Sequence, residues 1–332
     1  MRLALAALAL PTAPGLAALL ALAPLPATAQ EACPEGQRPF AHAAGETCIP
    51  EDPQRLVSLH DISVTLPLVE LGVTPVGSHG RTDEGEAAAI RSGLSGAGVS
   101  FENSGMAFVG GNPADAEAVA ALDPDLIVTT AWRTTDVERL SAIAPTVVLD
   151  DAALGIDGVY HELAALTGTE DRLARLQARY DANIARLRGL IEGQGYCGSI
   201  TSPWDEGIQA YGFQGAVDQI FRDVGVARPA ILDAIPDGER RDLSYERLPD
   251  LDGDFMLMFH FDNGGEAPDD ARATPAGRVS PGWCEALHAC REGQLHFLAI
   301  SDMSIPTFDN LHGLTMVLSA LLGGRDLARF EG

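Results

Sequence analysis

Several short apolar segments of this chain end in residues that bind ions or stack on ligands. His60 and Asp61 close the first such segment, and His79 and Arg81 close a second one about twenty residues later. Trp132-Arg133 follows the segment "DLIVTT" in the same way. Arginine forms paired hydrogen bonds to oxygen anions, tryptophan stacks on flat groups, and imidazole binds protons or metals. This combination indicates a binding site for a small molecule.

The segments that carry these residues alternate between β-type and helical patterns, which favours an α/β lobe with a mostly parallel sheet. Ligands of open α/β sheets bind beyond the carboxyl ends of the strands, so the polar residues that end these strands should share one edge. The expected strands are Arg55–His60, Thr74–His79, Leu126–Thr130 and Thr146–Leu149, and the expected helices are Ile62–Leu71, Ala114–Leu122 and Asp136–Ile143.

A single apolar stripe then predicts one long helix that begins at Thr169 and ends before Gly193. The stripe consists of Leu173, Leu176, Tyr180, Ile184, Leu187 and Ile191. After it, β-type segments resume and alternate with helical ones; they are Gly207–Gly212, Asp254–Phe261 and Gln294–Ile300, with helices over Gly215–Gly225 and Leu311–Leu322. We therefore expect two α/β lobes with mostly parallel sheets, joined by a single long helix, with a ligand cleft between the lobes.

The first residues of the chain are typical of a secretory signal peptide. They carry one charge, Arg2, and an Ala/Leu-rich stretch that ends in the small-x-small motif Ala27-Thr28-Ala29. We expect cleavage before Gln30 and a soluble protein in the periplasm. The expected divisions of the chain are a signal peptide over 1–29, an N-terminal tail over 30–52, a first lobe over 53–156, a connecting helical segment over 157–193 and a second lobe over 194–332.

The five cysteines of an exported protein predict two disulfides and one free thiol. Cys33 and Cys48 flank a Pro/Gly-rich stretch, and a bond between them would tie down the tail. Cys284 and Cys290 would lie about 9 Å apart along an unbroken helix, too far for a disulfide, so their pairing requires a helix that ends before Cys290. We predict these two disulfides and a free Cys197.

The chain is strongly acidic, with 47 acidic residues, 22 basic residues that are all arginine, and a formal net charge of −25. This charge argues against nucleic acid or an anionic membrane as a partner. It does not exclude a small anion, because a local group of arginines can bind one.

Four blocks of the sequence resemble the cobalamin and ferric-siderophore class of periplasmic substrate-binding proteins. In chain order they are "RLVSLHDISVTLPLVELGVTPVGS", "NPADAEAVAALDPDLIVTTAW", "LSAIAPTVVLD" and, after the long helix, "SPGWCEALHACREGQLHFL". The resemblance covers about residues 53–325. It implies a binding protein, not an enzyme, that holds its ligand between two lobes and hands it to an ATP-driven (ABC) importer in the inner membrane. We expect a monomer without a cofactor.

A ferric siderophore or a similar anionic iron chelate suits the residues at the strand ends. Arg81 and Arg133 would bond to the chelate oxygens, and aromatic rings would cover its flat or apolar parts. The chelate class stays open between catecholate, hydroxamate, hydroxycarboxylate and heme-like molecules, and Trp283 has an alternative place in the protein core. The expected ligand-binding residues are His60, His79, Arg81, Trp132, Arg133, Tyr211, His260 and Trp283, with Tyr211 or His260 able to fill an open iron position.

Direct capture of zinc or manganese, or of heme, is the alternative within the same fold. The candidate metal ligands are His60, His79, His260 and Asp302, all at predicted strand ends. A secreted hydrolase is the alternative from another class. The sequence gives it little support, because "HELAA" at 161–165 lacks the second histidine of a zinc-protease helix and "GLSGA" at 93–97 lacks the last glycine of a nucleophile elbow.

Two segments, "AEAVAALDPDL" and "LSYERLPDL", resemble the parts of the family that contact the permease. The resemblance implies that Glu117 and Glu246 are docking charges, one on each lobe. Each of them precedes a predicted strand, so their placement in the two lobes is matched.

Overall fold

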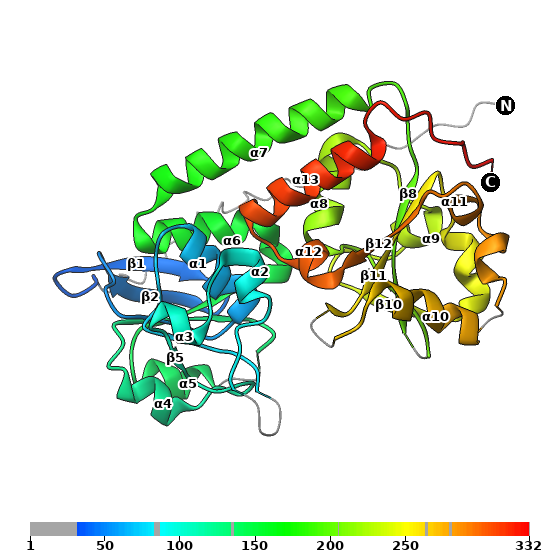
Figure 1. Cartoon of the computed structure of the whole chain (residues 1–332). Coiled ribbons are helices and arrows are strands. Elements are labelled where there is room, and N and C mark those ends of the chain that lie inside the picture. The colour runs from blue at the N-terminus through cyan, green and yellow to red at the C-terminus, as the bar shows by residue number, and fades with distance from the viewer. Residues whose placement is uncertain are drawn as a thin grey trace, which may run out of the picture. The chain divides into compact units, whose positions relative to one another are not determined.

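The computed structural model describes residues 32–82, 87–133, 136–204, 206–262, 265–278 and 281–331. Residues Cys33–Gly332 form one compact unit, which contains two α/β lobes (Figure 1). The predicted signal peptide, residues 1–29, lies outside the described residues. Within the described ranges, no helix has the length and apolar character needed to cross a membrane.

The first lobe is built on a parallel sheet with strand order β5-β4-β3-β6-β7. Its strands are β3 (Leu56–Ser58), β4 (Gly77–Ser78), β5 (Ala107–Phe108), β6 (Leu126–Thr130) and β7 (Thr146–Leu149). The helices between them are the π-helical turn η1 (Asp61–Thr65), α1 (Leu66–Glu70), α2 (Gly93–Ala97), α3 (Phe101–Ser104), α4 (Ala116–Ala121), α5 (Val137–Ser141) and α6 (Asp151–Thr167). The sheet and four of its strands were predicted, and β3 and β4 are shorter than expected.

The residues before the first lobe form an ordered hairpin rather than an irregular tail. Strands β1 (Gln37–His42) and β2 (Gly45–Pro50) pair antiparallel, and the predicted Cys33–Cys48 disulfide closes their base. Phe40 and Ile49 are buried in the core, which explains why the hairpin packs onto the lobe. The Ala43 N–H donates to the Val148 carbonyl of the edge strand β7 at 3.0 Å. The hairpin thus covers part of an edge that would otherwise be open to pairing.

The second lobe contains a mixed sheet with strand order β10-β9-β8-β11-β12. Strands β8 (Gly198–Trp204), β11 (Phe255–His260) and β12 (Leu295–Ala299) are parallel; β11 and β12 were predicted, whereas β8 was not. In contrast, β9 (Gly207–Tyr211) runs antiparallel to β8 and to β10 (Arg240–Leu243). The surrounding helices are α8 (Gly215–Val224), α9 (Ala230–Asp233), η2 (Tyr245–Leu251), α10 (Pro268–Arg278), η4 (Trp283–Ala286), α11 (His288–Arg291) and α12 (Ile300–Ser304).

The second disulfide is confirmed, and the reason is a break in the helix. The short helix η4 ends at Ala286, Leu287 is extended, and α11 begins at His288. This break brings the Cα atoms of Cys284 and Cys290 to 5.4 Å, within the range of a disulfide. Cys197 is free, as predicted.

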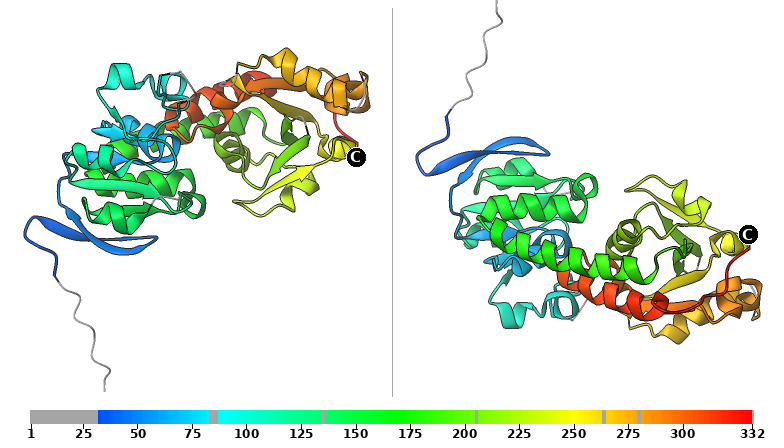
Figure 2. Two further views of the ribbon diagram at one scale, coloured as in Figure 1. Left: turned by 90° about the horizontal axis from the view of Figure 1, so that it is seen from below. Right: turned by 90° about the horizontal axis from the view of Figure 1, so that it is seen from above.

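The predicted long helix is α7 (Glu170–Leu190), and the C-terminal helix α13 (Phe308–Leu322) lies along it (Figures 1 and 2). The expected connecting segment 157–193 divides at Gly168, where φ is +66° and α6 ends. α6 belongs to the first lobe, and α7 runs from there to the second. One hydrophobic cluster includes residues of α6, α7, α8, α13 and both sheets, so the two lobes share a continuous core.

A buried carboxylate joins the first lobe to the start of α13. Glu70, the last residue of α1, accepts the backbone N–H groups of Phe308 at 2.8 Å and Asp309 at 2.7 Å. It also accepts a hydrogen bond from the Tyr160 hydroxyl of α6. The Phe308 ring packs edge-on against Tyr160, with 4.8 Å between centroids. A negative charge is favourable at a helix N-terminus, so Glu70 acts as an N-terminal cap supplied by another lobe.

We expect Glu70→Ala to lower the free energy of unfolding by about 3 kcal/mol, because it leaves buried donors of two lobes without an acceptor. Tyr160→Phe, which removes one of the three donors, should cost about 1 kcal/mol, and the exposed control Glu138→Ala should cost almost nothing. Urea denaturation measures all three variants. A Glu70→Ala protein as stable as the Glu138→Ala control would contradict this role.

Candidate ligand-binding site

The structure brings together four of the residues predicted to bind ligand. His60 follows β3, His79 follows β4, and Trp132 and Arg133 follow β6, so the parallel sheet places all four at one edge. The His60 and His79 rings are stacked with centroids 6.3 Å apart, and Trp132 meets His60 edge-on at 5.0 Å. The Arg133 guanidinium lies over the Trp132 ring, 4.5 Å from its centroid. We call these four residues the strand-end cluster.

Asp61 contacts two members of the strand-end cluster, His79 and Arg133. Its carboxylate is fully buried and accepts hydrogen bonds from Arg91 Nε at 2.8 Å and from the Arg91 backbone N–H at 3.1 Å. His79 Nδ1 lies 3.2 Å from Asp61 Oδ1. Burial alone would raise the pKa of Asp61, but the hydrogen bonds from Arg91 and His79 outweigh it and hold the pKa well below its usual value. Asp61 therefore stays charged and fixes the neighbouring donors.

His79 contacts two charged side chains. Its Nδ1 lies 3.2 Å from Asp61 Oδ1 and 3.3 Å from Arg133 Nη2, and its Nε2 lies 3.1 Å from Arg133 Nη1. Burial lowers the pKa of Arg133 to about 10, so the guanidinium keeps its charge at neutral pH.

Two buried N–H groups of the strand-end cluster have no acceptor among the described residues. The Ser63 N–H donates to His60 Nδ1 at 2.7 Å, so the proton of the neutral ring resides on Nε2, which has no partner. Burial, and then the Arg133 charge, lower the pKa of His60 to about 2, so the ring remains neutral. Arg133 Nε is the second such donor. Buried unpaired donors are costly, and they are common where a ligand supplies the acceptor.

Trp132 contacts both residues that carry these donors, and its own side chain is partly exposed to solvent. The indole is 54% exposed, although it contacts both His60 and Arg133. A flat or apolar ligand can stack on this ring, and movement of the ring would open the two donors to ligand oxygens. The indole N–H lies 3.3 Å from Asp151 Oδ2 at the start of α6.

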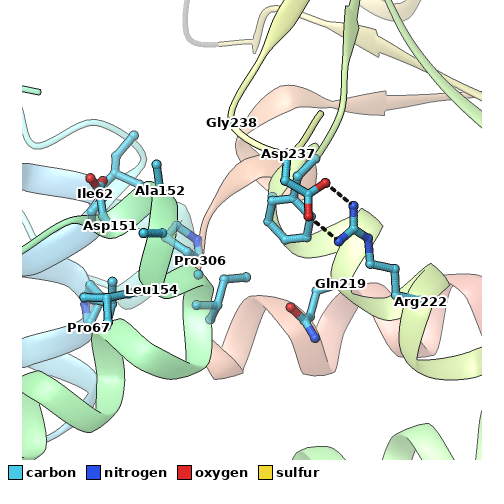
Figure 3. Close-up of a pocket in the computed structure, with 17 residues that line it drawn as sticks. Ile62, Pro67, Asp151, Ala152, Leu154, Gln219, Arg222, Asp237, Gly238 and Pro306 are labelled. Carbon is cyan, nitrogen blue, oxygen red and sulfur yellow. Dashed lines mark hydrogen bonds and ion pairs between the residues drawn. The ribbon is translucent and has the colours of Figure 1, made fainter. Parts of the chain in front are cut away.

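A cavity of ≈ 420 Å³ lies between the lobes (Figure 3). Two of its lining residues, Ser63 and Asp151, make hydrogen bonds with His60 and Trp132 of the cluster. Its volume falls in the range of small-molecule pockets. The first lobe contributes residues of η1, α1 and α6, and the second lobe contributes α8 and the loops next to it. The apolar lining includes Ile62, Pro67, Leu154, Ile156, Val159, Phe213 and Pro306, and the polar lining includes Asp151, Gln219, Arg222 and Asp237. We call it the interlobe cavity.

The charges on the second-lobe wall of the cavity are paired. Arg222 Nη1 donates to Asp237 Oδ2 at 2.7 Å, and its guanidinium lies over the Phe213 ring at 5.0 Å. The hydrogen bond to Asp237 raises the pKa of Arg222. Both side chains are roughly half exposed, so this ion pair adds little to stability. The carboxylate of Asp237 nevertheless compensates the positive charge of Arg222.

The sequence did not predict the residues of this wall. Phe213 directly follows the expected strand Gly207–Gly212 but was not among the predicted ligand residues. Arg222 lies within the expected helix Gly215–Gly225, and its approach to the first lobe depends on how the lobes pack. Asp151 could have been found, because it follows β7 just as His60 follows β3. Arg91 lies in a turn without a diagnostic spacing.

The other predicted ligand residues lie in more varied places. Arg81 is exposed just beyond β4, near the strand-end cluster in sequence. His260 ends β11, with Nδ1 3.1 Å from the Glu266 carbonyl. Tyr211 donates to Gln209 Oε1 at 2.8 Å. The rule that placed Tyr211 beside His260 was wrong for this strand, because β9 runs antiparallel to β8 and its end does not share the edge where β11 ends.

Trp283 does not line the ligand site. Its side chain is 3% exposed and packs in the core of the second lobe with Met258 and Leu287, so the alternative reading as a core residue is correct. A different tryptophan is exposed in that lobe. Trp204 ends the parallel strand β8, is 43% exposed, and packs on Phe261 at 4.6 Å. Sequence reasoning missed it because Pro203 obscured the strand.

The four residues of the metal alternative do not come together. Among the residues that the structure describes, no three His, Cys, Asp or Glu side chains are placed to hold a metal ion. His60 and His79 lie in the first lobe, whereas His260 and Asp302 lie in the second. The observed site is therefore an aromatic and arginine cluster beside a largely apolar cavity.

Comparison with known proteins identifies the class of protein that this fold and site define. Residues 68–276 match the model of a family described as periplasmic binding protein, and the chain belongs to this family. This is a family of binding proteins and not of enzymes.

Individual relatives are more distant. The chain is 28% identical over 165 residues to the iron(3+)-hydroxamate-binding protein FhuD of Bacillus subtilis, a match that covers 47% of this chain and 52% of that protein. The chain thus aligns with about half the length of the curated relatives that it matches.

Solved structures confirm the fold over most of the chain. The structure of Staphylococcus aureus SirA complexed with staphyloferrin B superposes with a TM-score of 0.70 at 23% identity, over 86% of this chain and 98% of SirA. A binding protein component of a ferrichrome ABC transporter from Bacillus subtilis superposes with a TM-score of 0.68 at 22% identity, over 86% of this chain and 100% of that one.

The buried charge of Asp61 generates a stability prediction. Asp61→Ala should lower the free energy of unfolding by about 3–5 kcal/mol at neutral pH, because it leaves a buried arginine without its counter-charge. Since the folded-state pKa of Asp61 is depressed, its contribution is present above the pKa of the unfolded chain and is lost as the pH falls through the folded-state pKa. The difference between wild type and variant, measured by urea denaturation from neutral to acidic pH, should shrink toward low pH. A loss that is the same at every pH would show that the charge of Asp61 is not what stabilises the cluster.

Proposed function

We propose that this protein is the solute-binding component of an ABC importer and captures a ferric siderophore or a similar anionic iron chelate. The observation that carries the proposal is the strand-end cluster, which presents an exposed tryptophan and unpaired buried donors beside a cavity between two lobes. A chelate has the matching properties, since it combines iron-bound oxygens with an organic frame. The names of the relatives, which include an iron(3+)-hydroxamate-binding protein, support the same ligand class.

The arginines of the first lobe supply the attraction for chelate oxygens. Arg81 is exposed at the edge of the sheet, and Arg133 lies beneath Trp132 with its charge intact. Arg91 is committed to Asp61. We therefore assign direct contact to Arg81 and assign Arg133 a contact that forms when Trp132 shifts over the ligand.

Export and delivery complete the proposal. The signal peptide predicted over 1–29 would place the protein in the periplasm, where it would hand the chelate to an inner-membrane permease. Glu117 is exposed in the first turn of α4, and Glu246 is exposed at the start of η2. Their exposure on separate lobes supports the proposed role of docking charges.

Titration of the purified protein with ferric chelates tests the ligand. Trp132 and Trp204 are exposed and should report binding through fluorescence quenching. We expect Arg81→Ala, Arg133→Ala to weaken chelate binding tenfold or more, since a charge-assisted hydrogen bond contributes about 1.5–3 kcal/mol. The matched control is Arg139→Ala, an exposed arginine on α5. Unchanged chelate affinity in the double variant would refute the arginine contacts, and tight zinc binding without chelate binding would favour the metal alternative.

The docking charges predict a separation of binding from transport. Glu117→Ala, Glu246→Ala should leave ligand affinity and stability unchanged, because exposed charges contribute little to either. The same variant should reduce uptake through the cognate importer, where such charges set orientation and encounter rate. The control replaces one exposed glutamate on each lobe outside these segments, Glu138→Ala with Glu292→Ala. Normal uptake by the first variant would rule out docking, and weakened ligand binding would place the two glutamates in the cleft instead.

A further inference from the structure

The interlobe cavity contains a carboxylate that lacks a donor. Asp151 Oδ1 is shielded from solvent and has no hydrogen-bond partner among the described residues, while Oδ2 faces the indole N–H of Trp132 at 3.3 Å. A carboxylate oxygen that loses its hydration normally gains a hydrogen bond in exchange, because an unpaired one is costly. Asp151 lines the cavity, and a rotation of its side chain would present this oxygen to a molecule bound there.

Asp151 also carries the unmatched charge of the cavity. The charged residues of the lining are Asp151, Arg222 and Asp237, two acids and one arginine. Arg222 and Asp237 form an ion pair with each other, which leaves Asp151 as the unpaired charge among the lining residues; outside the lining, its charge acts on Arg133 of the strand-end cluster. Asp151 is the first residue of α6, in the short turn before the kink at Gly155. The cavity is therefore suited to a single positive charge.

The remaining walls define what must accompany that charge. Leu154 and Ile156 on α6, Pro67 on α1 and Phe213 in the second lobe are apolar residues that line the same cavity. Figure 3 shows Leu154 and Pro67 on the same side of the cavity as Asp151. A free inorganic cation would find too few oxygens there, in agreement with the absence of a metal-binding group among the described residues. A hydrocarbon chain with a cationic end satisfies both the apolar walls and the carboxylate.

We infer that the interlobe cavity binds an apolar arm of the iron chelate that ends in a protonated amine, and that Asp151 binds the amine. This inference rests on the proposed function. It divides the ligand by charge, with the iron-bound oxygens on the arginine side of Trp132 and the cationic end on the acidic side. Asp151 would then be a specificity-determining residue that distinguishes chelates with the same iron-binding groups.

A pair of chelates that differ in this group alone provides the test. The probes are a linear ferric trihydroxamate with a free terminal amine and the same chelate with that amine acetylated. Both have the same iron coordination, but acetylation removes the positive charge. We expect wild-type protein to bind the amine form at least tenfold more tightly, and Asp151→Asn to bind the two forms with nearly equal affinity. Fluorescence quenching measures all four affinities.

Asp157→Asn is the matched control. Asp157 lies on the same helix α6, and its replacement by asparagine removes the same charge. However, Asp157 lines a different cavity, together with Tyr180 and Asp223. This variant should keep the wild-type preference for the amine form. If Asp151→Asn fails to fold, as judged by its thermal unfolding, the preference of the wild-type protein still decides the question.

The possible failures are distinguishable. If wild-type protein binds both chelates equally and tightly, the inference about Asp151 is overturned and the proposed function stays intact. The same conclusion follows if wild-type protein binds other ferric chelates but neither of the two trihydroxamates. If Asp151→Asn lowers the affinity for both chelates by the same factor, Asp151 acts by holding Trp132, and the inference about the amine is also overturned. Failure of wild-type protein to bind any ferric chelate would overturn both proposals.

Discussion

The contact on which the rest of the structure depends is the capping of α13 by Glu70. A two-lobed binding protein must hold its lobes at a distance that leaves space for a ligand. A connecting helix alone joins the lobes along only one side of that space. Glu70, at the end of α1, accepts the first N–H groups of α13, and Tyr160 of α6 donates to the same carboxylate. The first lobe is thereby bonded to a helix that packs along α7 and against the second lobe. Burial raises the pKa of Glu70, which reflects the cost of placing a carboxylate there.

This junction positions the interlobe cavity and the strand-end cluster. Pro306, two residues before Phe308, lines the interlobe cavity, and Pro67 on α1 lines it from the other side. The strand-end cluster lies beside the cavity because His60 is followed directly by η1 and α1, which lead to Glu70. The same short segment therefore carries His60 of the strand-end cluster, the buried Asp61, a cavity wall and the cap of α13. A substitution in this segment can change binding through any of these roles, so stability must be measured alongside affinity.

Much of this arrangement could be predicted from the sequence. Apolar runs predicted β6 and β7 with their observed bounds, and one apolar stripe predicted α7. Because the first sheet is parallel, the rule for strand ends correctly grouped His60, His79, Trp132 and Arg133. The same rule failed for Tyr211, since no local pattern reveals that β9 reverses direction. Periodicity also could not distinguish Trp283 in the core from Trp204 on the surface. Phe213 directly follows an expected strand, so its place in the cavity wall could have been predicted, whereas Arg222 lies on a helix and reaches the cavity only through packing between the lobes.

The central claim is that an iron chelate is held between the lobes, against Trp132 and with part of its frame in the interlobe cavity. A crystal of the protein grown with a tightly binding ferric chelate, measured at the iron absorption edge, locates the iron directly. The account predicts one strong anomalous peak between the lobes near Trp132 and Arg81, with ligand density that continues into the cavity beside Leu154 and Phe213. A peak coordinated by His260 and Asp302, or a bound chelate outside the space between the lobes, would contradict it.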